Sequence, residues 1–190
     1  MAGDAVYLTF DDGPIPEATP WVLDTLAKYE AKATFFCVGD NVRKHKSIFD
    51  RISNEGHSIG NHSQHHLNGW YTDSMKYIAD VTEAAEYIDS NLYRPPYGKL
   101  KPSQYKALKK EYRIIMWDVL SMDYDPTVTA EQCKDIVLKN TKEGSIVVFH
   151  DSLKSIDKLK AVLPGILRTF QERGLQMKAI TNHSFNNKTV

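Results

Sequence analysis

Two adjacent carboxylates, Asp11 and Asp12, end the apolar run at residues 7–10 and precede Gly13-Pro14. Such a run is typical of a β-strand, and Gly-Pro marks the turn into a loop. Carboxylates held close together repel each other, so both stay ionised at pH 7 only where a cation or hydrogen-bond donors offset the repulsion. The pair therefore indicates a metal site. An ordinary Asp-Gly turn is the alternative.

The densest group of metal-ligating residues is the segment 61–66, which holds three of the seven histidines. His62 and His66 are four residues apart, so one helical turn would aim both imidazoles at a common point. His65 would face away and is not expected to be a ligand. With Asp12, the pair supplies two imidazoles and one carboxylate, which leaves coordination positions open for water and substrate. A polar loop with chance histidines is the alternative.

The ligand types narrow the chemistry. Two histidines and a carboxylate also hold iron in non-haem oxygenases, but those usually have antiparallel jelly-roll folds. Because this chain alternates strands and helices, we favour one divalent ion in a Lewis-acid role, Zn first, with Co and Ni as alternatives. Zn brings the pKa of bound water to roughly 7 and polarises carbonyl oxygens. The ligand set thus predicts a hydrolase.

The elements that must position these residues alternate along the chain. Strands are predicted at 6–10, 33–38, 56–60, 93–98, 113–119, 145–149 and 176–180, and helices at 20–30, 41–54, 73–92, 102–110, 129–140 and 156–173. Alternation implies a parallel sheet with right-handed crossovers. A full eightfold barrel usually needs about 200 residues or more, so the chain predicts an α/β fold, a distorted, incomplete (β/α) barrel of about seven parallel strands. A doubly wound open sheet is the alternative.

Composition limits the class of protein and of partner. The 190 residues, 42% apolar and 25% charged, are ordinary for a single globular domain spanning 1–190, and we expect a monomer. The formal net charge is zero, so no long-range field would recruit nucleic acid, and a neutral polysaccharide is easier to accommodate. Cys37 and Cys133 lack metal-ligand spacing and are expected to be buried free thiols.

Targeting signals are not visible in the sequence. No run of about 18 apolar residues exists, so no membrane span is predicted. The first six residues are too short and polar for a signal peptide. Either the protein is cytoplasmic or a leader was trimmed. The carboxylate pair lies so close to residue 1 that we favour trimming, with a secreted, periplasmic or cell-envelope location.

Five segments together resemble, in order, the motifs of the polysaccharide deacetylases, carbohydrate esterase family 4 (the NodB homology domain). They are 9–14 (TFDDGP), 62–66 (HSQHH), 94–98 (RPPYG), 117–124 (WDVLSMDY) and 144–151 (GSIVVFHD). The resemblance implies a distorted β/α barrel and metal-dependent removal of N- or O-linked acetyl groups from a carbohydrate. Polymers of the N-acetylglucosamine type, chitin or peptidoglycan, are favoured, and acetylated xylan is an alternative.

The resemblance also implies roles by position. Asp11 would be the general base that takes a proton from the attacking water, while Asp12, His62 and His66 bind the metal. A carboxylate that binds the metal is a poor base, so two are needed. Arg94 would hold Asp11 in place, and its fixed opposite charge would keep that base ionised.

Further roles follow from the later motifs. The backbone N–H of Tyr97 would stabilise the oxyanion, and one such donor lowers the activation barrier by on the order of 3 kcal/mol. His150 would be the general acid that protonates the leaving amine or alcohol, and Asp123 the carboxylate that orients it. Val148, on the same strand face as His150, would line the pocket for the acetate methyl. Asp118 is a rival partner for His150.

Two positions depart from the family pattern. Many members have Asp at the position of Leu120, so its absence leaves the carboxylate role to Asp123. Many have Trp at the position of Tyr124, and the tyrosine hydroxyl changes the aromatic wall that meets the acyl group. Trp117 is expected in the core.

Several alternatives stay open at this level. The plainer interpretation of Arg94 is a surface cation without a role in catalysis. That of His150 is a structural histidine. For Trp70 and Tyr71 the two alternatives are stacking on a sugar ring of the substrate and packing in the hydrophobic core. For the whole chain, the alternatives are a catalytically silent carbohydrate-binding relative and a metal-dependent hydrolase that acts on another bond, such as a small cyclic amide.

Overall fold

The computed structural model describes residues 5–181 and residue 184. The strands of this part of the chain form one curled parallel sheet. The strands are β1 (Ala5–Asp11), β2 (Ala33–Cys37), β3 (Ser58–Asn61), β4 (Leu92–Tyr93), β5 (Arg113–Ile114), β6 (Val119–Leu120), β7 (Ile146–His150) and β8 (Gln176–Met177). Their order is β5-β4-β3-β2-β1-β7-β6, with β8 also paired to β1, and every pairing is parallel. The end strands β5 and β6 do not pair with each other, so the predicted distorted, incomplete (β/α) barrel is confirmed.

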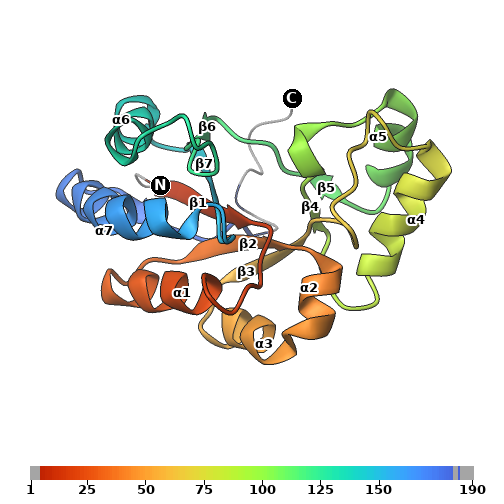
Figure 1. Ribbon diagram of the computed structural model, residues 1–190, viewed down its shortest axis with the longest axis horizontal. Helices are drawn as coiled ribbons and strands as arrows, with labels where there is room; N and C mark the ends of the chain where they lie inside the picture. The colour runs from red at the N-terminus through yellow and green to blue at the C-terminus, as the bar shows by residue number, and fades with distance from the viewer. Residues whose placement is uncertain (1–4, 182–183, 185–190) are drawn as a thin grey trace.

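Helices cover the outside of the sheet (Figure 1). They are α1 (Thr19–Lys28), α2 (Gly39–Lys44), α3 (Lys46–Asn54), α4 (Ser74–Ala84), α5 (Pro102–Leu108), α6 (Ala130–Asn140) and α7 (Ile156–Glu172), with a 3₁₀ turn, η1 (Pro96–Gly98). Figure 1 shows α1 to α3 along one side of the sheet, α6 and α7 beside β7, and α4 and α5 beyond β4 and β5. No helix in the described part of the chain is long and apolar enough to cross a membrane.

The middle strands are buried on both faces, as the continuous apolar run of β2 predicts. The Phe10 ring stacks between Phe35 at 5.2 Å and Phe149 at 5.6 Å, on the face that the helices cover. Phe36 belongs to a separate buried cluster on the other face. Burying each aromatic side chain contributes about 1.5–3 kcal/mol, which makes these strands a rigid support for the loops that follow them. Both cysteines are buried free thiols, as predicted.

One predicted strand, 113–119, is in fact two. β5 ends at Ile114 and β6 begins at Val119. Between them the carbonyls of Ile115 and Met116 accept hydrogen bonds from Arg94 Nε at 3.1 Å and Nη2 at 3.2 Å. The buried guanidinium of Arg94 therefore occupies carbonyls that could otherwise accept hydrogen bonds from a neighbouring strand. The barrel is open between β5 and β6. The strands predicted at 93–98 and 176–180 also shorten, the first because prolines cannot donate to a ladder.

The helix predicted at 41–54 breaks at His45, where φ is −129° and ψ is 47°. The break gives the two halves different partners, since α2 packs against α4 while α3 packs against α1 and β3. The helix predicted at 73–92 begins as expected, with Asp73 accepting the N–H groups of Met75 and Lys76. It ends early, at Ala84, and tighter turns then carry the buried side chain of Ile88 into the core. The remaining predicted strands and helices are confirmed with small shifts of their ends.

The carboxyl ends of the parallel strands meet at one edge of the sheet, which positions the candidate site. Asp11 is the last residue of β1 and lies opposite His150, the last residue of β7. On the other side, Asn61 at the end of β3 pairs with Tyr93 at the end of β4. Loops with the chemistry-bearing residues leave each of these ends, so segments far apart in sequence meet over β1.

Candidate active site and metal centre

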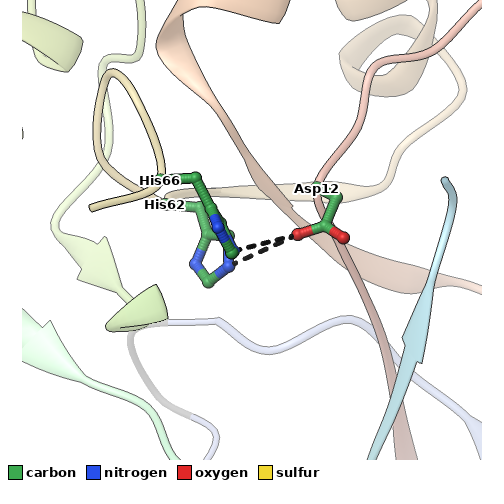
Figure 2. A group of neighbouring side chains, drawn as sticks. All are labelled: Asp12, His62 and His66. Atoms are coloured by element: carbon green, nitrogen blue, oxygen red, sulfur yellow. Dashed lines mark ion pairs between the residues drawn. The ribbon is translucent and has the colours of Figure 1, made fainter. Parts of the chain in front are cut away.

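A carboxylate and two imidazoles meet beside the ends of β1 and β3 (Figure 2). Asp12 Oδ1 lies 3.3 Å from His66 Nε2 and 3.8 Å from His62 Nε2. The ligand atoms that the three side chains offer all lie within 4.8 Å of one another. The structure thus brings together the three residues that the sequence predicts as metal ligands. We call them the ligand triad.

Two members of the ligand triad, Asp12 and His62, have the protonation states and free atoms that suit a divalent ion. Asp12 Oδ1 is buried and accepts no hydrogen bond within the described residues. Burial raises the pKa of Asp12, but the imidazoles of His66, His62 and His150 outweigh it and lower that pKa to about 2. Burial lowers the pKa of His62 to about 4, so this imidazole is neutral at pH 7. Its Nδ1 lies 2.7 Å from the Arg94 carbonyl, which leaves the Nε2 lone pair for an ion.

The loop between the two histidines is not the predicted helical turn. Ser63 has φ of 64° and His66 φ of 55°, both in the left-handed region. Each such residue costs on the order of 1 kcal/mol, so neighbouring structure must hold the loop. Gly39, the first residue of α2, donates its N–H to the Ser63 carbonyl at 2.9 Å. The imidazoles therefore converge through left-handed turns, and the predicted helical turn was wrong although the two histidines do come together.

A buried aspartate on α4 holds the same loop from the other side. Asp80 Oδ2 accepts the N–H groups of Gln64 and His65, each at 3.1 Å, and Oδ1 lies 2.6 Å from His65 Nδ1. His65 thus faces away from the ligand triad, as predicted. His65, Asp80 and Glu83 form a second group with metal-ligating atoms, but the Asp80 carboxylate is already occupied by these bonds. The sequence signal we missed is an aspartate within the apolar stripe of a predicted helix.

Arg94 is fully buried, which excludes the surface-cation alternative. Its Nη1 donates to Asp11 Oδ1 at 2.7 Å and to Thr9 Oγ1 at 2.6 Å. The guanidinium also lies 4.2 Å from the ring centroid of Phe36. Burial lowers the pKa of Arg94, and the charge of Asp11 opposes that change. The arrangement fixes one oxygen of Asp11, while Oδ2 accepts no hydrogen bond from the described residues and is free to take a proton.

His150 and Asp123 form a doubly bonded pair. His150 Nδ1 lies 2.7 Å from Asp123 Oδ1, and the His150 backbone N–H donates to Oδ2, also at 2.7 Å. Burial lowers the pKa of His150, but the hydrogen bond and charge of Asp123, with the charges of Asp11 and Asp12, raise it to about 9. The imidazole is therefore protonated at neutral pH and can donate a proton.

Asp118, the rival partner for His150, has another role. Its Oδ2 accepts the Ile146 N–H at 2.8 Å, at the start of β7 rather than its end. His150 is the last residue of that strand. The structure therefore contradicts the pairing of Asp118 with His150.

The ligand triad opens into a cleft of about 750 Å³. Tyr97 lines it in a left-handed conformation, with φ of 59°, and its ring lies edge-on to His66 at 4.7 Å. The Tyr97 N–H donates no backbone hydrogen bond within the described residues, so it is available to a ligand. Tyr124 lines the cleft as well, with its ring 4.9 Å from that of His150.

Two predictions about the cleft wall need revision. Val148 is only 1% exposed and is not among the residues that line the cleft. Its register partner Leu120 is, so the departure from the family pattern lies directly on the wall. Trp117, expected in the core, also lines the cleft. Its ring packs directly on Gly98, where a Cβ would lie 2.5 Å from the nearest ring atom.

The loop after β1 is held by two residues that the sequence did not single out. Asp12 has φ of 83°, and Asn41 Nδ2 donates to its carbonyl at 2.8 Å. Asp151 Oδ1 accepts the Gly13 N–H at 3.1 Å, and a Cβ on Gly13 would lie 2.0 Å from the Asp151 carboxylate. Burial raises the pKa of Asp151 to about 8, against the hydrogen bond from Thr19. Its place beside His150 in the fifth motif was a usable signal, whereas nothing local marked Asn41.

Comparisons with known proteins agree with the motifs. The family model described as polysaccharide deacetylase matches residues 1–114. Two proteins of Bacillus cereus, each named peptidoglycan-N-acetylglucosamine deacetylase, are similar to this chain. One is 36% identical over 171 residues, covering 84% of this chain and 62% of the relative, and the other is 32% identical over 186 residues, covering 93% and 86%. This chain thus spans less than two thirds of the first relative.

The fold of this chain is also similar to solved structures of deacetylases. The Bc1960 peptidoglycan N-acetylglucosamine deacetylase, crystallised with 4-naphthalen-1-yl-N-oxidanyl-benzamide, superposes with a TM-score of 0.82 at 32% identity. The match covers 93% of this chain and 86% of that one. The peptidoglycan deacetylase PdaC from Bacillus subtilis superposes with a TM-score of 0.84 at 26% identity.

Proposed function

The chain belongs to the polysaccharide deacetylase family, and from this premise we propose that it is a metal-dependent hydrolase that removes acetyl groups from the N-acetylglucosamine residues of peptidoglycan. One observation carries the proposal. A base held by Arg94 and an acid held by Asp123 stand at the ends of adjacent strands, beside a ligand triad that opens into a cleft. The names of the similar Bacillus cereus proteins favour peptidoglycan among acetylated polymers.

The ligand triad of Asp12, His62 and His66 would hold the ion. When bound, a divalent ion polarises an acetyl carbonyl and lowers the pKa of water beside it. Zn suits two imidazoles and a carboxylate with an open position, and Co and Ni accept the same donors. The uncharged imidazole of His62 and the ionised carboxylate of Asp12 support this assignment.

Asp11 is the general base in this mechanism. As water adds to the acetyl carbon, Asp11 takes its proton on Oδ2, because Oδ1 is held by Arg94. The carbonyl oxygen gains negative charge as the new C–O bond forms. The Tyr97 N–H then donates to that oxygen, and one such donor lowers the barrier by about 3–4 kcal/mol.

His150 is the general acid. It gives a proton to the amide nitrogen as the C–N bond breaks, so the products are acetate and a free amine on the sugar. Asp123 holds Nδ1, which keeps Nε2 as the donating nitrogen. Tyr124, Leu120 and Trp117 form the wall of the cleft and exclude water from the acyl group.

Acetate release from purified peptidoglycan tests this function, with chito-oligosaccharide and acetylated xylan assayed side by side. We expect Asp11→Asn to lower the rate by about a hundredfold or more while zinc stays bound, because the general base is lost and the ligands remain. His62→Ala should lose both activity and zinc. Substantial acetate release by Asp11→Asn would contradict the mechanism. Sugar binding by the wild-type protein without acetate release would identify a catalytically silent relative instead.

A further inference from the structure

The rim of the cleft carries positive charge that no neighbour neutralises. Lys99 and Lys154 both line the cleft, and neither ammonium group forms an ion pair or hydrogen bond within the described residues. The lining contains two acids. Asp12 belongs to the ligand triad, and Asp40 is paired with two basic side chains of α2. A ligand that enters the cleft therefore meets unpaired positive charge at the rim.

Lys99 is held in place by an exposed aromatic ring. Its Nζ lies 4.5 Å from the ring centroid of Trp70, which is 55% exposed, and the neighbouring Tyr71 is 84% exposed. A cation–π contact of this kind orients the ammonium without neutralising its charge. The surface continues from the ligand triad, since the His66 ring packs on Tyr97 and Tyr97 is followed closely by Lys99.

The segment that carries Trp70 is rigid. Gly69 packs directly on the chain at Lys99, because a Cβ there would lie 2.2 Å from the Lys99 carbonyl. The buried Gln104 donates from Nε2 to the Gly69 carbonyl at 2.9 Å and accepts the Lys101 N–H at 2.8 Å. Lys101 Nζ donates to the Thr72 carbonyl at 2.7 Å. One lysine is thus used to fix the loop, while Lys99, two residues earlier, keeps its charge available.

From this arrangement we propose that Trp70 and Lys99 form a subsite for a sugar that carries a carboxylate and adjoins the sugar being deacetylated. The ring offers an apolar face that suits the C–H groups of a sugar, and the ammonium offers a partner for the carboxylate. In peptidoglycan, every second sugar bears a lactyl ether whose carboxylate is either free or extended by an acidic peptide. The inference rests on the proposed deacetylase function and adds selection of acidic over neutral strands.

The test compares one glycan in two charge states. The probe is a tetrasaccharide of alternating N-acetylglucosamine and N-acetylmuramic acid without peptides, with its carboxylates either free or converted to N-methylamides. We expect the wild-type protein to have a kcat/KM about fivefold higher for the free acid, the effect of one ion pair near a surface. In Lys99→Gln the two forms should become equal.

Lys106→Gln is the matched control, because it removes the same charge from an exposed position on α5 outside the cleft lining. It should keep the wild-type preference. A wild-type protein without preference, a preference that survives in Lys99→Gln, or one that is lost in Lys154→Gln instead would each overturn the proposal. Absence of acetate release from every form would refute the proposed function itself, which separates the two failures.

Discussion

Asp11 and His150 lie at the ends of neighbouring strands, yet their surroundings prepare them for opposite proton transfers. Arg94 Nη1 donates to Oδ1 of Asp11 and so leaves Oδ2 as the oxygen that can take a proton from water. Asp123 places a negative charge on His150 and raises the pKa of the imidazole to about 9 despite burial. Pairs of groups whose environments push their protonation apart are the usual basis of acid–base catalysis.

Asp123→Asn tests the acid. The protonated form of His150 is complete well below its pKa of about 9 and is lost as the pH rises through that value. Removing the charge of Asp123 takes away the largest contribution that raises this pKa, while burial, which lowers it, remains. We expect the alkaline limb of kcat to move down by about one to three pH units, measured at a fixed zinc concentration.

Asp118→Asn is the control for that profile. Asp118 accepts a hydrogen bond from the Ile146 N–H at the start of β7, away from His150. The alkaline limb of the kcat profile of Asp118→Asn should therefore match that of the wild-type protein. An unchanged limb in Asp123→Asn, or a shifted limb in Asp118→Asn, would mean that the acid has been assigned to the wrong pair.

Residue types and motif order predicted that the side chains of Asp12, His62 and His66 would come together, but not which residues support them. Asp11, Asp12, His62 and His66 carry their chemistry in local patterns that can be read from the sequence. Asn41 and Asp151 hold the loop after β1 through contacts that only the folded chain creates.

At the scale of elements, α4 decides the shape of the loop that carries His62 and His66. Asp80 accepts three donors from residues 64 and 65, and Asn61 Nδ2 donates to the Val81 carbonyl at 3.0 Å. These bonds hold a loop with left-handed residues at Ser63 and His66. The helix therefore contributes to the site without supplying any ligand of the triad.

Asp80→Ala should weaken zinc binding by about tenfold or more, the usual cost of removing a residue that supports a metal ligand. Competition with a chromophoric chelator measures this without reference to activity. Asp80→Asn should remain close to the wild-type affinity, because the amide oxygen still accepts the Gln64 and His65 N–H groups and its NH₂ group can donate to His65 Nδ1.

Glu83→Ala separates this role from a second metal site. Glu83 is exposed and lies near His65 and Asp80, but it does not hold the loop. We expect the zinc affinity and stoichiometry of the Glu83→Ala variant to equal those of the wild-type protein. An unchanged affinity in Asp80→Ala, or a lower stoichiometry in Glu83→Ala, would contradict the supporting role.

Element types could be predicted where hydrophobic pattern alone decides them. The apolar run at residues 33–38 predicted a strand, and the structure has β2 there. The split between β5 and β6 could not be predicted, because it depends on Arg94 bonding the carbonyls of Ile115 and Met116 from a distant part of the sequence. The secondary-structure propensities of neighbouring residues cannot reveal a contact with a residue that is distant in sequence.

At the scale of the whole molecule, an ion in the ligand triad would join two separate strand ends. Asp12 follows β1 and the two histidines follow β3, with β2 between them in the sheet. Because the unfolded chain does not bring these residues together, an ion held there would bind the native state preferentially and stabilise it.

Zinc should therefore raise the melting temperature. At a free zinc concentration about a hundredfold above Kd, the stabilisation is about 2.7 kcal/mol, which corresponds to roughly 5–10 °C for a chain of this size. Scanning calorimetry in chelator and in zinc measures the shift. His66→Ala should show little of it, and an equal shift in that variant would place the stabilising ion elsewhere.

The central claim is the position of the ion, and anomalous diffraction at the zinc edge from crystals grown with zinc tests it most directly. The account predicts one strong peak per chain, about 2.0–2.2 Å from His62 Nε2, His66 Nε2 and a carboxylate oxygen of Asp12. A peak at His65, Asp80 and Glu83 with none at the ligand triad would contradict it.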